Sequence, residues 1–580
     1  MKKIYIAVAI FLVLSIALFI ASFVYLDKSK RRTYDYVVTL DGHVAGTIRV
    51  DKFITEDRLV YKSNADLPFY PLFTECRSRL DLDRKYNIES YSKETIAGRV
   101  VNNVYLENAK GLVTSLSRYQ SRFAYVDDIP TKRGTFVFEE DSPMTYMPII
   151  ANYDFSKGRS QVFSTITYLT DPGLPPMKKI MVFTSIKDEY LKVDSRKIKT
   201  ENLIIKARNY PQAAVWVAKS DGAIIKIELP AKSVTITRSF RPRTLTAKKV
   251  ALQDPRYLSK EIAFKSKNVE LTGTLTTPTR EGRFPAVLLV GGGVPADRDM
   301  QGLFASIADD LSKNGFCVLR YDRRGIGSSK ADAASATDSD EAADSLSALV
   351  YLKSQNPVDP DKIAVLGHAK GAYYALKLSS EKSYIKGLVL MAPTLAMDQT
   401  ADKKAEAIKN EAAKAQWPED YINLVLRAWR TTEAKVKDAG GDWINILGKK
   451  CYLKAMREEM ADAPMAIAGK VKIPVFILQG KDDEDAVLET AASLDKALAE
   501  TGNQNHSLKY YGYLGHFFGK SVTDGTQKSY YDTDKAVMVN MKDWLDKVFA
   551  EAETKPTEAE APAPEAAPVK APPEPAARID

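Results

Sequence analysis

Residues 361–376, DKIAVLGHAKGAYYAL, decide the fold of the C-terminal half of this 580-residue chain. The apolar run 363–366 predicts a buried strand, and the small residues that follow predict a helix. The turn between them, GHAKG at 367–371, has the spacing G-x-S-x-G, which presents its middle residue at the tip of a sharp turn. A serine there would carry an attacking hydroxyl. This chain has Ala369 instead, and a methyl group cannot attack a carbonyl.

Two further residues suited to nucleophilic catalysis lie downstream. An apolar strand is predicted at 473–478, and Asp483 stands three residues after Gly480 in the acidic turn that follows. His516 comes after a strand-like stretch at 508–511. An imidazole takes a proton from a nucleophile, and a carboxylate fixes its tautomer. The order Ser…Asp…His is that of a catalytic triad, with Asp483 as the orienting acid and His516 as the base.

Two upstream segments complete the pattern. A buried strand predicted at 284–290 leads into three glycines, 291–293, and a second at 316–321 leads into the turn 322–329. Glycines at the end of such a strand let backbone N–H groups approach a substrate, and they form half of an oxyanion hole.

Together these five stretches resemble the α/β-hydrolase superfamily over about 255–550, and more narrowly its bacterial esterase and serine aminopeptidase-like branch. The resemblance implies a doubly wound α/β domain and ester or peptide hydrolysis through an acyl-enzyme. It also implies that Asp483 orients His516 and that the backbone N–H groups of Gly293 and Lys370 hold the oxyanion.

The residues that depart from the family pattern lie in the motifs that carry the catalytic groups. Ala369 replaces the serine, Lys370 stands where a small or polar residue is usual, Val294 replaces a glycine, and Ala486 replaces a valine. An engineered serine replacement would not explain Lys370 and Val294. We therefore expect an inactive member, a pseudohydrolase, that binds an acyl or peptide ligand under the cap, or a partner protein. The alternatives are an active hydrolase with a displaced nucleophile, and a structural envelope scaffold.

Several residues near the turn have two interpretations. Ser328 or Ser329 is the candidate for a displaced nucleophile. The Lys370 ammonium either reaches the vacated position and favours an anionic ligand, or is solvated on the first helical turn. We expect His368 to pack under the turn, and the charged residues at 297–299 and 322–324 to brace loops.

Composition narrows the function further. The net charge of +9 is spread along the chain without a basic stripe and interleaved aromatics, so no nucleic-acid site is predicted. The four histidines are scattered, and the three cysteines (Cys76, Cys317 and Cys451) have no metal or disulfide spacing. We expect no metal and no cofactor.

The N-terminus predicts a membrane anchor over 1–32. An uncharged apolar run at 4–26 is long enough to span a bilayer, and its end is a poor signal-peptidase site. Basic residues after the run favour a cytoplasmic body by the positive-inside rule. A short charged N-terminus before such a run is, however, the usual export signal. We expect an extracytoplasmic body in a bacterial cell envelope.

The remaining segments differ in composition and hydrophobic pattern. Residues 33–250 alternate like strands and carry Asp-Gly turns at 41–42 and 221–222, which predicts an antiparallel, curved sheet. This region resembles bacterial envelope domains of the lipoprotein-carrier or half-barrel type, and its concave face holds either a ligand or an ordinary core. Residues 397–468 predict a helical cap, and 551–580, rich in Pro, Ala and Glu, a disordered tail.

Overall fold

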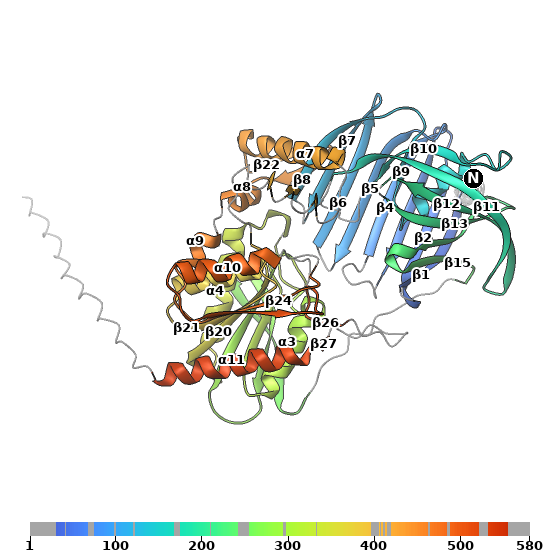
Figure 1. Cartoon of the computed structure of the whole chain (residues 1–580). Coiled ribbons are helices and arrows are strands. Elements are labelled where there is room, and N and C mark those ends of the chain that lie inside the picture. The colour runs from blue at the N-terminus through green and yellow to red at the C-terminus, as the bar shows by residue number, and fades with distance from the viewer. Residues whose placement is uncertain are drawn as a thin grey trace, which may run out of the picture.

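The structure is a computed structural model, and Figure 1 shows its curved N-terminal sheet beside a C-terminal α/β domain. No helix in the described part of the chain is both long and apolar enough to cross a membrane. The predicted anchor at 4–26 lies outside that part, as do residues 555–580 of the predicted tail. The described residues are 31–40, 42–67, 75–97, 100–119, 122–167, 175–208, 210–241, 254–293, 297–331, 333–395, short pieces within 405–413, 419–461, 464–483, 488–520 and 532–554.

A single 15-stranded sheet forms the N-terminal region. Its order is β8-β7-β6-β5-β4-β3-β2-β1-β15-β14-β13-β12-β11-β10-β9, and every pair is antiparallel except β9 with β10. The predicted antiparallel β-rich region is therefore present. Its strands are β1 (Arg31–Leu40), β2 (His43–Ile54), β3 (Arg58–Asp66), β4 (Glu75–Asp83), β5 (Ile88–Ala97), β6 (Val100–Ala109), β7 (Leu112–Tyr119), β8 (Arg122–Pro130), β9 (Thr135–Phe138), β10 (Gln161–Thr167), β11 (Met177–Val193), β12 (Arg196–Ala207), β13 (Tyr210–Ala218), β14 (Ile224–Leu229) and β15 (Val234–Ser239).

The inner face of this sheet is filled by its own core. Helix α2 (Pro143–Ala151) contributes Met144, Tyr146 and Ile149 to one apolar cluster with residues from strands all along the sheet. The sheet curls far enough for Lys93 on β5 to pair with Glu139, which follows β9, at 2.8 Å. The concave face is thus occupied by an ordinary core, the second of the two predicted interpretations.

The α/β domain is built on an eight-stranded sheet of order β16-β17-β19-β18-β20-β21-β24-β25. Strand β17 runs antiparallel to both of its neighbours, β16 and β19, and the remaining pairs are parallel. The order of the strands reverses between β18 and β20. Open α/β sheets bind ligands in a crevice at such a switch point. The strands are β16 (Tyr257–Ser266), β17 (Val269–Pro278), β18 (Phe284–Gly292), β19 (Cys317–Tyr321), β20 (Val358–Ala369), β21 (Ile385–Met391), β24 (Val475–Gly480) and β25 (His506–Tyr511).

Helices cover both faces of this sheet and bury a separate apolar cluster on each. Helix α11 reaches Thr554, so residues 551–554, predicted as part of the tail, are helical instead. The helices are α3 (Leu303–Lys313), α4 (Asp338–Lys353), α5 (Gly371–Glu381), α10 (Leu488–Glu500) and α11 (Lys535–Thr554). Short elements are the 3-10 turns η1 (Pro230–Lys232), η2 (Met300–Gly302) and η3 (Ala333–Ser335), and the strands β26 (Gly519–Lys520) and β27 (Asp532–Thr533).

The insertion predicted as a helical cap contains α7 (Glu419–Asp438), α8 (Lys454–Ala461) and α9 (Pro464–Ala468), and also a hairpin of β22 (Trp443–Ile446) and β23 (Lys449–Tyr452). Helix α7 packs against the N-terminal sheet. In its first half and middle, Tyr421 and Trp429 cluster with Met177 of β11, and near its end Val436 clusters with Tyr105 of β6. The insertion therefore joins the two domains, which its sequence did not indicate.

Candidate active site

The turn that follows β20 has the geometry of a nucleophile elbow. Ala369 ends the strand with φ +53° and is buried. A Cβ on Gly371 would lie 2.0 Å from the carbonyl oxygen of Val290, and one on Gly367 would lie 2.5 Å from the carbonyl oxygen of Gly371. Left-handed backbone at a residue other than glycine costs of order 1–3 kcal/mol. The strained turn is kept although its central residue has no hydroxyl.

Asp483 and His516 are brought together by neighbouring strands. Asp483 follows β24 and His516 follows β25, and these strands pair in parallel. The His516 Nδ1 lies 3.1 Å from both carboxylate oxygens, and both side chains are buried. Gln479 Nε2 donates to Asp483 Oδ2 at 3.0 Å. With Nδ1 held by Asp483, Nε2 is the nitrogen available to exchange a proton.

His368 packs under the turn, as its position predicts. Its ring is fully buried and lies 4.7 Å from the His516 ring and 5.5 Å from that of Phe517, between centroids. Burial, with a smaller contribution from the neighbouring His516, lowers the pKa of His368 to about 3. His368 is therefore neutral at physiological pH.

Glycines and Lys370 lie together on the predicted oxyanion side. Gly292 is in register with Ala369 across the β18–β20 pair, so the carboxyl ends of both strands meet here. Gly293 has φ +76°, and a Cβ on it would lie 3.6 Å from the backbone nitrogen of Lys370. Val294 and Ala486, the other departures from the family pattern, lie outside the described residues.

The Lys370 ammonium adopts neither of the two predicted arrangements. It pairs with the buried Asp338 carboxylate at 2.9 Å, while the Tyr374 hydroxyl donates to the same carboxylate at 2.8 Å. Asp338 is the first residue of α4, where the helix dipole favours an anion. The capping box of Thr337 and Asp340 indicates the start of α4 in the sequence. It does not indicate that Asp338 pairs with Lys370, 32 positions away.

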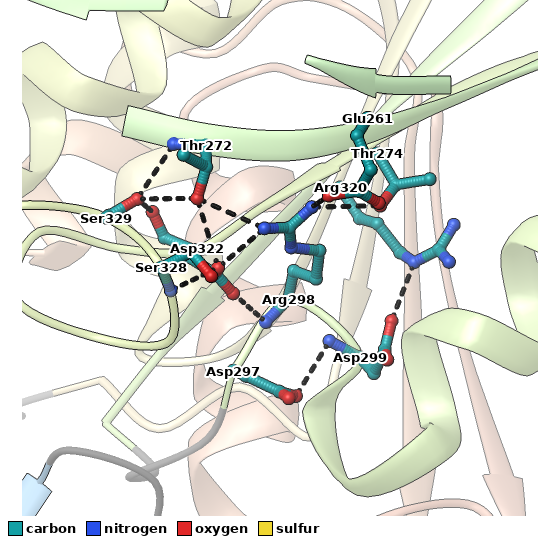
Figure 2. A network of polar contacts seen from close by, with 10 residues as sticks. All are labelled: Glu261, Thr272, Thr274, Asp297, Arg298, Asp299, Arg320, Asp322, Ser328 and Ser329. Atoms are coloured by element: carbon teal, nitrogen blue, oxygen red, sulfur yellow. Dashed lines mark hydrogen bonds and ion pairs between the residues drawn. The ribbon is translucent and has the colours of Figure 1, made fainter. Parts of the chain in front are cut away.

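The charged loops at the carboxyl ends of β18 and β19 hold one another (Figure 2). Arg298 donates to Asp322 at 2.8 Å and to Glu261 at 2.5 Å, and Arg320 donates to Asp299 at 2.9 Å. Burial raises the pKa of Asp322, but the hydrogen bonds and charge of Arg298 outweigh it and hold that pKa below its usual value. The predicted bracing role of these charges is confirmed.

Ser329 is part of the same network. Its buried hydroxyl donates to the Asp322 carbonyl at 2.6 Å and accepts from the Thr272 N–H at 2.9 Å. Thr272 is on β17, and β19 and β18 separate that strand from β20. Ser328 is exposed, and its N–H donates to Asp322 at 2.9 Å. Neither contact resembles a nucleophile beside its base.

Metal ligands do not gather in the described residues, where no group of three or more His, Cys, Asp or Glu side chains is placed to hold an ion. The described residues at the elbow place a His–Asp pair beside the end of β20.

Known proteins match the α/β domain. The family model described as serine aminopeptidase, S33, matches residues 293–518. Esterase EstD of Thermotoga maritima is 27% identical over 312 residues, which are 52% of this chain and 71% of EstD. An uncharacterised protein of Mycobacterium tuberculosis is 34% identical over 125 residues, 22% of this chain and 42% of that protein.

Solved structures cover about half of the chain. Est1E of Butyrivibrio proteoclasticus with bound ferulic acid covers 50% of this chain and 99% of its own, with 18% identity and a TM-score of 0.37. An esterase of Pyrococcus furiosus covers 54% of this chain and 98% of its own, with 17% identity and a TM-score of 0.33. On the family and sequence matches, the α/β domain belongs to the α/β-hydrolase superfamily. Within it, residues 293–518 are similar to the serine aminopeptidase, S33, family.

Proposed function

We propose that this protein is a pseudohydrolase, which binds an acyl or peptide group of a ligand or partner and does not cleave it. The observation that carries the proposal is Ala369 itself, held at φ +53° at the tip of the elbow. Removing the nucleophile of a serine hydrolase costs on the order of a million-fold in kcat. The base and acid that remain do not replace it, because they only activate a nucleophile.

The groups that remain are suited to binding. Backbone N–H groups at Gly293 and Lys370 would donate to a carbonyl or carboxylate oxygen, and His516 Nε2 would donate or accept beside them. The esterase name of the Thermotoga relative and the aminopeptidase family support an ester, acyl or peptide group as the ligand. We place that ligand at the carboxyl ends of β18 and β20.

Restoring the missing hydroxyl tests this proposal. The Ala369→Ser variant should gain weak hydrolysis of short-chain p-nitrophenyl esters, and His516→Ala in that background should abolish it. Activity should stay weak because of Val294, since an imperfect oxyanion side costs roughly a hundred- to a thousand-fold. Adding Val294→Gly should raise it. A folded double variant as inert as the parent would mean that the α/β domain is only a scaffold.

We also propose that residues 4–26 anchor the protein in a membrane and that its body is extracytoplasmic in a bacterial envelope. The uncharged apolar run supports this. The full chain should fractionate with membranes, and deletion of residues 1–32 should release it. A mature chain that begins after residue 26 would show that the segment is cleaved instead.

A further inference from the structure

One rim of the N-terminal sheet carries the start of β1. Because the strands are antiparallel neighbours, alternate turns return to the same rim, and β15 ends beside β1 where Ser239 pairs with Asp35. We call it the basic rim. It comprises the turns at 55–57, 84–87, 110–111, 131–134, 194–195 and 219–223, the two strand residues on either side of each turn, Arg31, Arg32, and residues 238–241.

The charge of this rim differs from that of the whole chain. The chain has 83 basic and 74 acidic residues, whereas the rim has fourteen basic and six acidic ones. The acidic residues are Glu56, Asp57, Asp83, Glu89, Asp194 and Asp221. The basic residues are Arg31, Arg32, Arg58, Arg84, Lys85, Lys110, Lys132, Arg133, Lys192, Arg196, Lys197, Lys219, Arg238 and Arg241.

Several of these acids are used inside the turns. Asp83 accepts the backbone N–H groups of Lys85 and Asn87, both at 2.8 Å. Asp194 accepts the Phe240 N–H at 2.7 Å, which fastens the β11–β12 turn to the end of β15. The basic side chains sit mostly at exposed positions of the rim. Arg31 pairs with Asp51, Arg58 with Asp57 and Lys219 with Asp188, and the remaining excess of basic residues makes the outward field positive.

Aromatic rings lie among the basic side chains. Arg196 lies over the Phe240 ring at 4.3 Å, and Arg238 lies over Tyr34 at 4.7 Å and over Phe240 at 5.0 Å. Beside the rim, Tyr190 is 59% exposed and carries Lys197 over its ring at 4.7 Å. Aromatic and basic side chains together are typical of protein surfaces at the headgroup level of a bilayer.

The chain connects this rim to the predicted anchor. Arg31 is five residues after position 26, where the apolar run ends, so the two are at most about 17 Å apart. The cap contacts β11 at Met177, the opposite end of a 17-residue strand. That end is up to about 50 Å from the basic rim. The other cap contacts are made in mid-strand, by Val436 with Tyr105 of β6 and by Arg427 with Asp127 of β8, so none of these contacts covers a rim residue.

We propose that the basic rim rests on an anionic bilayer surface. The inference depends on the proposed anchor, but it adds a lipid-headgroup contact that an anchor alone does not require. The positive field of the rim complements phosphatidylglycerol or another anionic lipid. Its association should weaken with salt, because the Debye length falls from about 10 Å at 0.1 M to about 3 Å at 1 M.

The test uses the full chain reconstituted in vesicles, with Cys76→Ser in the background because the other two cysteines are buried. A fluorophore is placed at Ser220→Cys, just past the rim end of β13, or at Gln212→Cys, near the other end of the same strand. Both positions are exposed. The vesicles carry a headgroup nitroxide quencher in phosphatidylcholine, with or without about one third phosphatidylglycerol.

We expect quenching at position 220 to exceed that at 212 at least about twofold in the anionic vesicles at low salt, and to fall at high salt. Lys132→Glu with Arg133→Glu should reduce it. Lys206→Glu with Arg208→Glu, near the far end of β12, should not. Three results would overturn the rim proposal alone, provided that the chain co-floats with the vesicles. They are equal quenching at both positions, quenching that does not depend on phosphatidylglycerol or salt, and an equal loss of quenching in both charge variants. Failure to co-float would overturn the anchor and the rim together.

Discussion

His368 Nε2 donates a hydrogen bond to the backbone carbonyl oxygen of His516 at 2.9 Å. This bond ties the strand that ends at Ala369 to the loop that carries the base. The position of His516 over the elbow therefore depends on a neutral, buried imidazole one residue before the nucleophile position.

Stability should depend on pH through His368. Its native pKa is about 3, against an ordinary value of 6.5, so between these values the unfolded chain binds a proton that the native state does not. The free energy of unfolding should then fall with falling pH, by about 2 kcal/mol from pH 7 to pH 5. Denaturant titration of His368→Gln should show a pH dependence weaker by that amount. Identical pH profiles would contradict the assignment.

The elbow should not tolerate a methyl group at Gly371. Its Cβ would overlap the Val290 carbonyl oxygen, and the atoms it meets are backbone. Gly371→Ala should therefore lower the free energy of unfolding by about 3 kcal/mol or more. Gly440→Ala, where a Cβ meets nothing within 4 Å, should stay within about 0.5 kcal/mol of the parent. Denaturant melts of both variants decide this, and equal stability would mean a looser turn.

Arg298 should be needed to hold the Asp322 charge (Figure 2). Arg298→Met leaves that buried carboxylate without its cation, which typically costs about 3–5 kcal/mol. The pKa of Asp322 should rise in the variant, so its deficit should be largest at pH 7 and shrink toward pH 4 as the carboxyl protonates. Glu261→Gln, whose side chain is 76% exposed, should change stability little. A deficit independent of pH would point to lost packing instead.

Ser329 should matter for stability and not for chemistry. Ser329→Ala removes two hydrogen bonds of a buried hydroxyl and should cost about 2 kcal/mol, while the exposed Ser328→Ala should cost at most about 0.5 kcal/mol. Thermal melts and ester hydrolysis measured together separate the roles. If either alanine variant abolished a hydrolysis that the parent performs, the displaced-nucleophile alternative would hold.

The sequence predicted the features that follow from local pattern. Strand–turn–glycine spacing is a property of a few neighbouring residues, so the elbow, the α/β-hydrolase fold and the β-rich region could be inferred. Contacts between distant segments leave no such pattern. Examples are the Lys370–Asp338 pair, the filling of the N-terminal sheet by α2, and the contact of α7 with that sheet.

The cap shows where prediction from local sequence pattern fails. Its composition predicts helices, but a short hairpin at 443–452 interrupts them, because pairing of Trp443 with Tyr452 decides the local structure. The aromatic side chains of the cap also depend on distant contacts. Trp429 packs with Met177 of the other domain, and Trp443 is 51% exposed.

Labelling of the unaltered full chain with a fluorophosphonate tests the loss of the nucleophile most directly. Such a probe reacts with a serine activated by its base, and Ala369 offers none. We predict no labelling of the parent, and labelling at position 369 in Ala369→Ser that His516→Ala removes. Labelling of the parent that maps to any serine would contradict it.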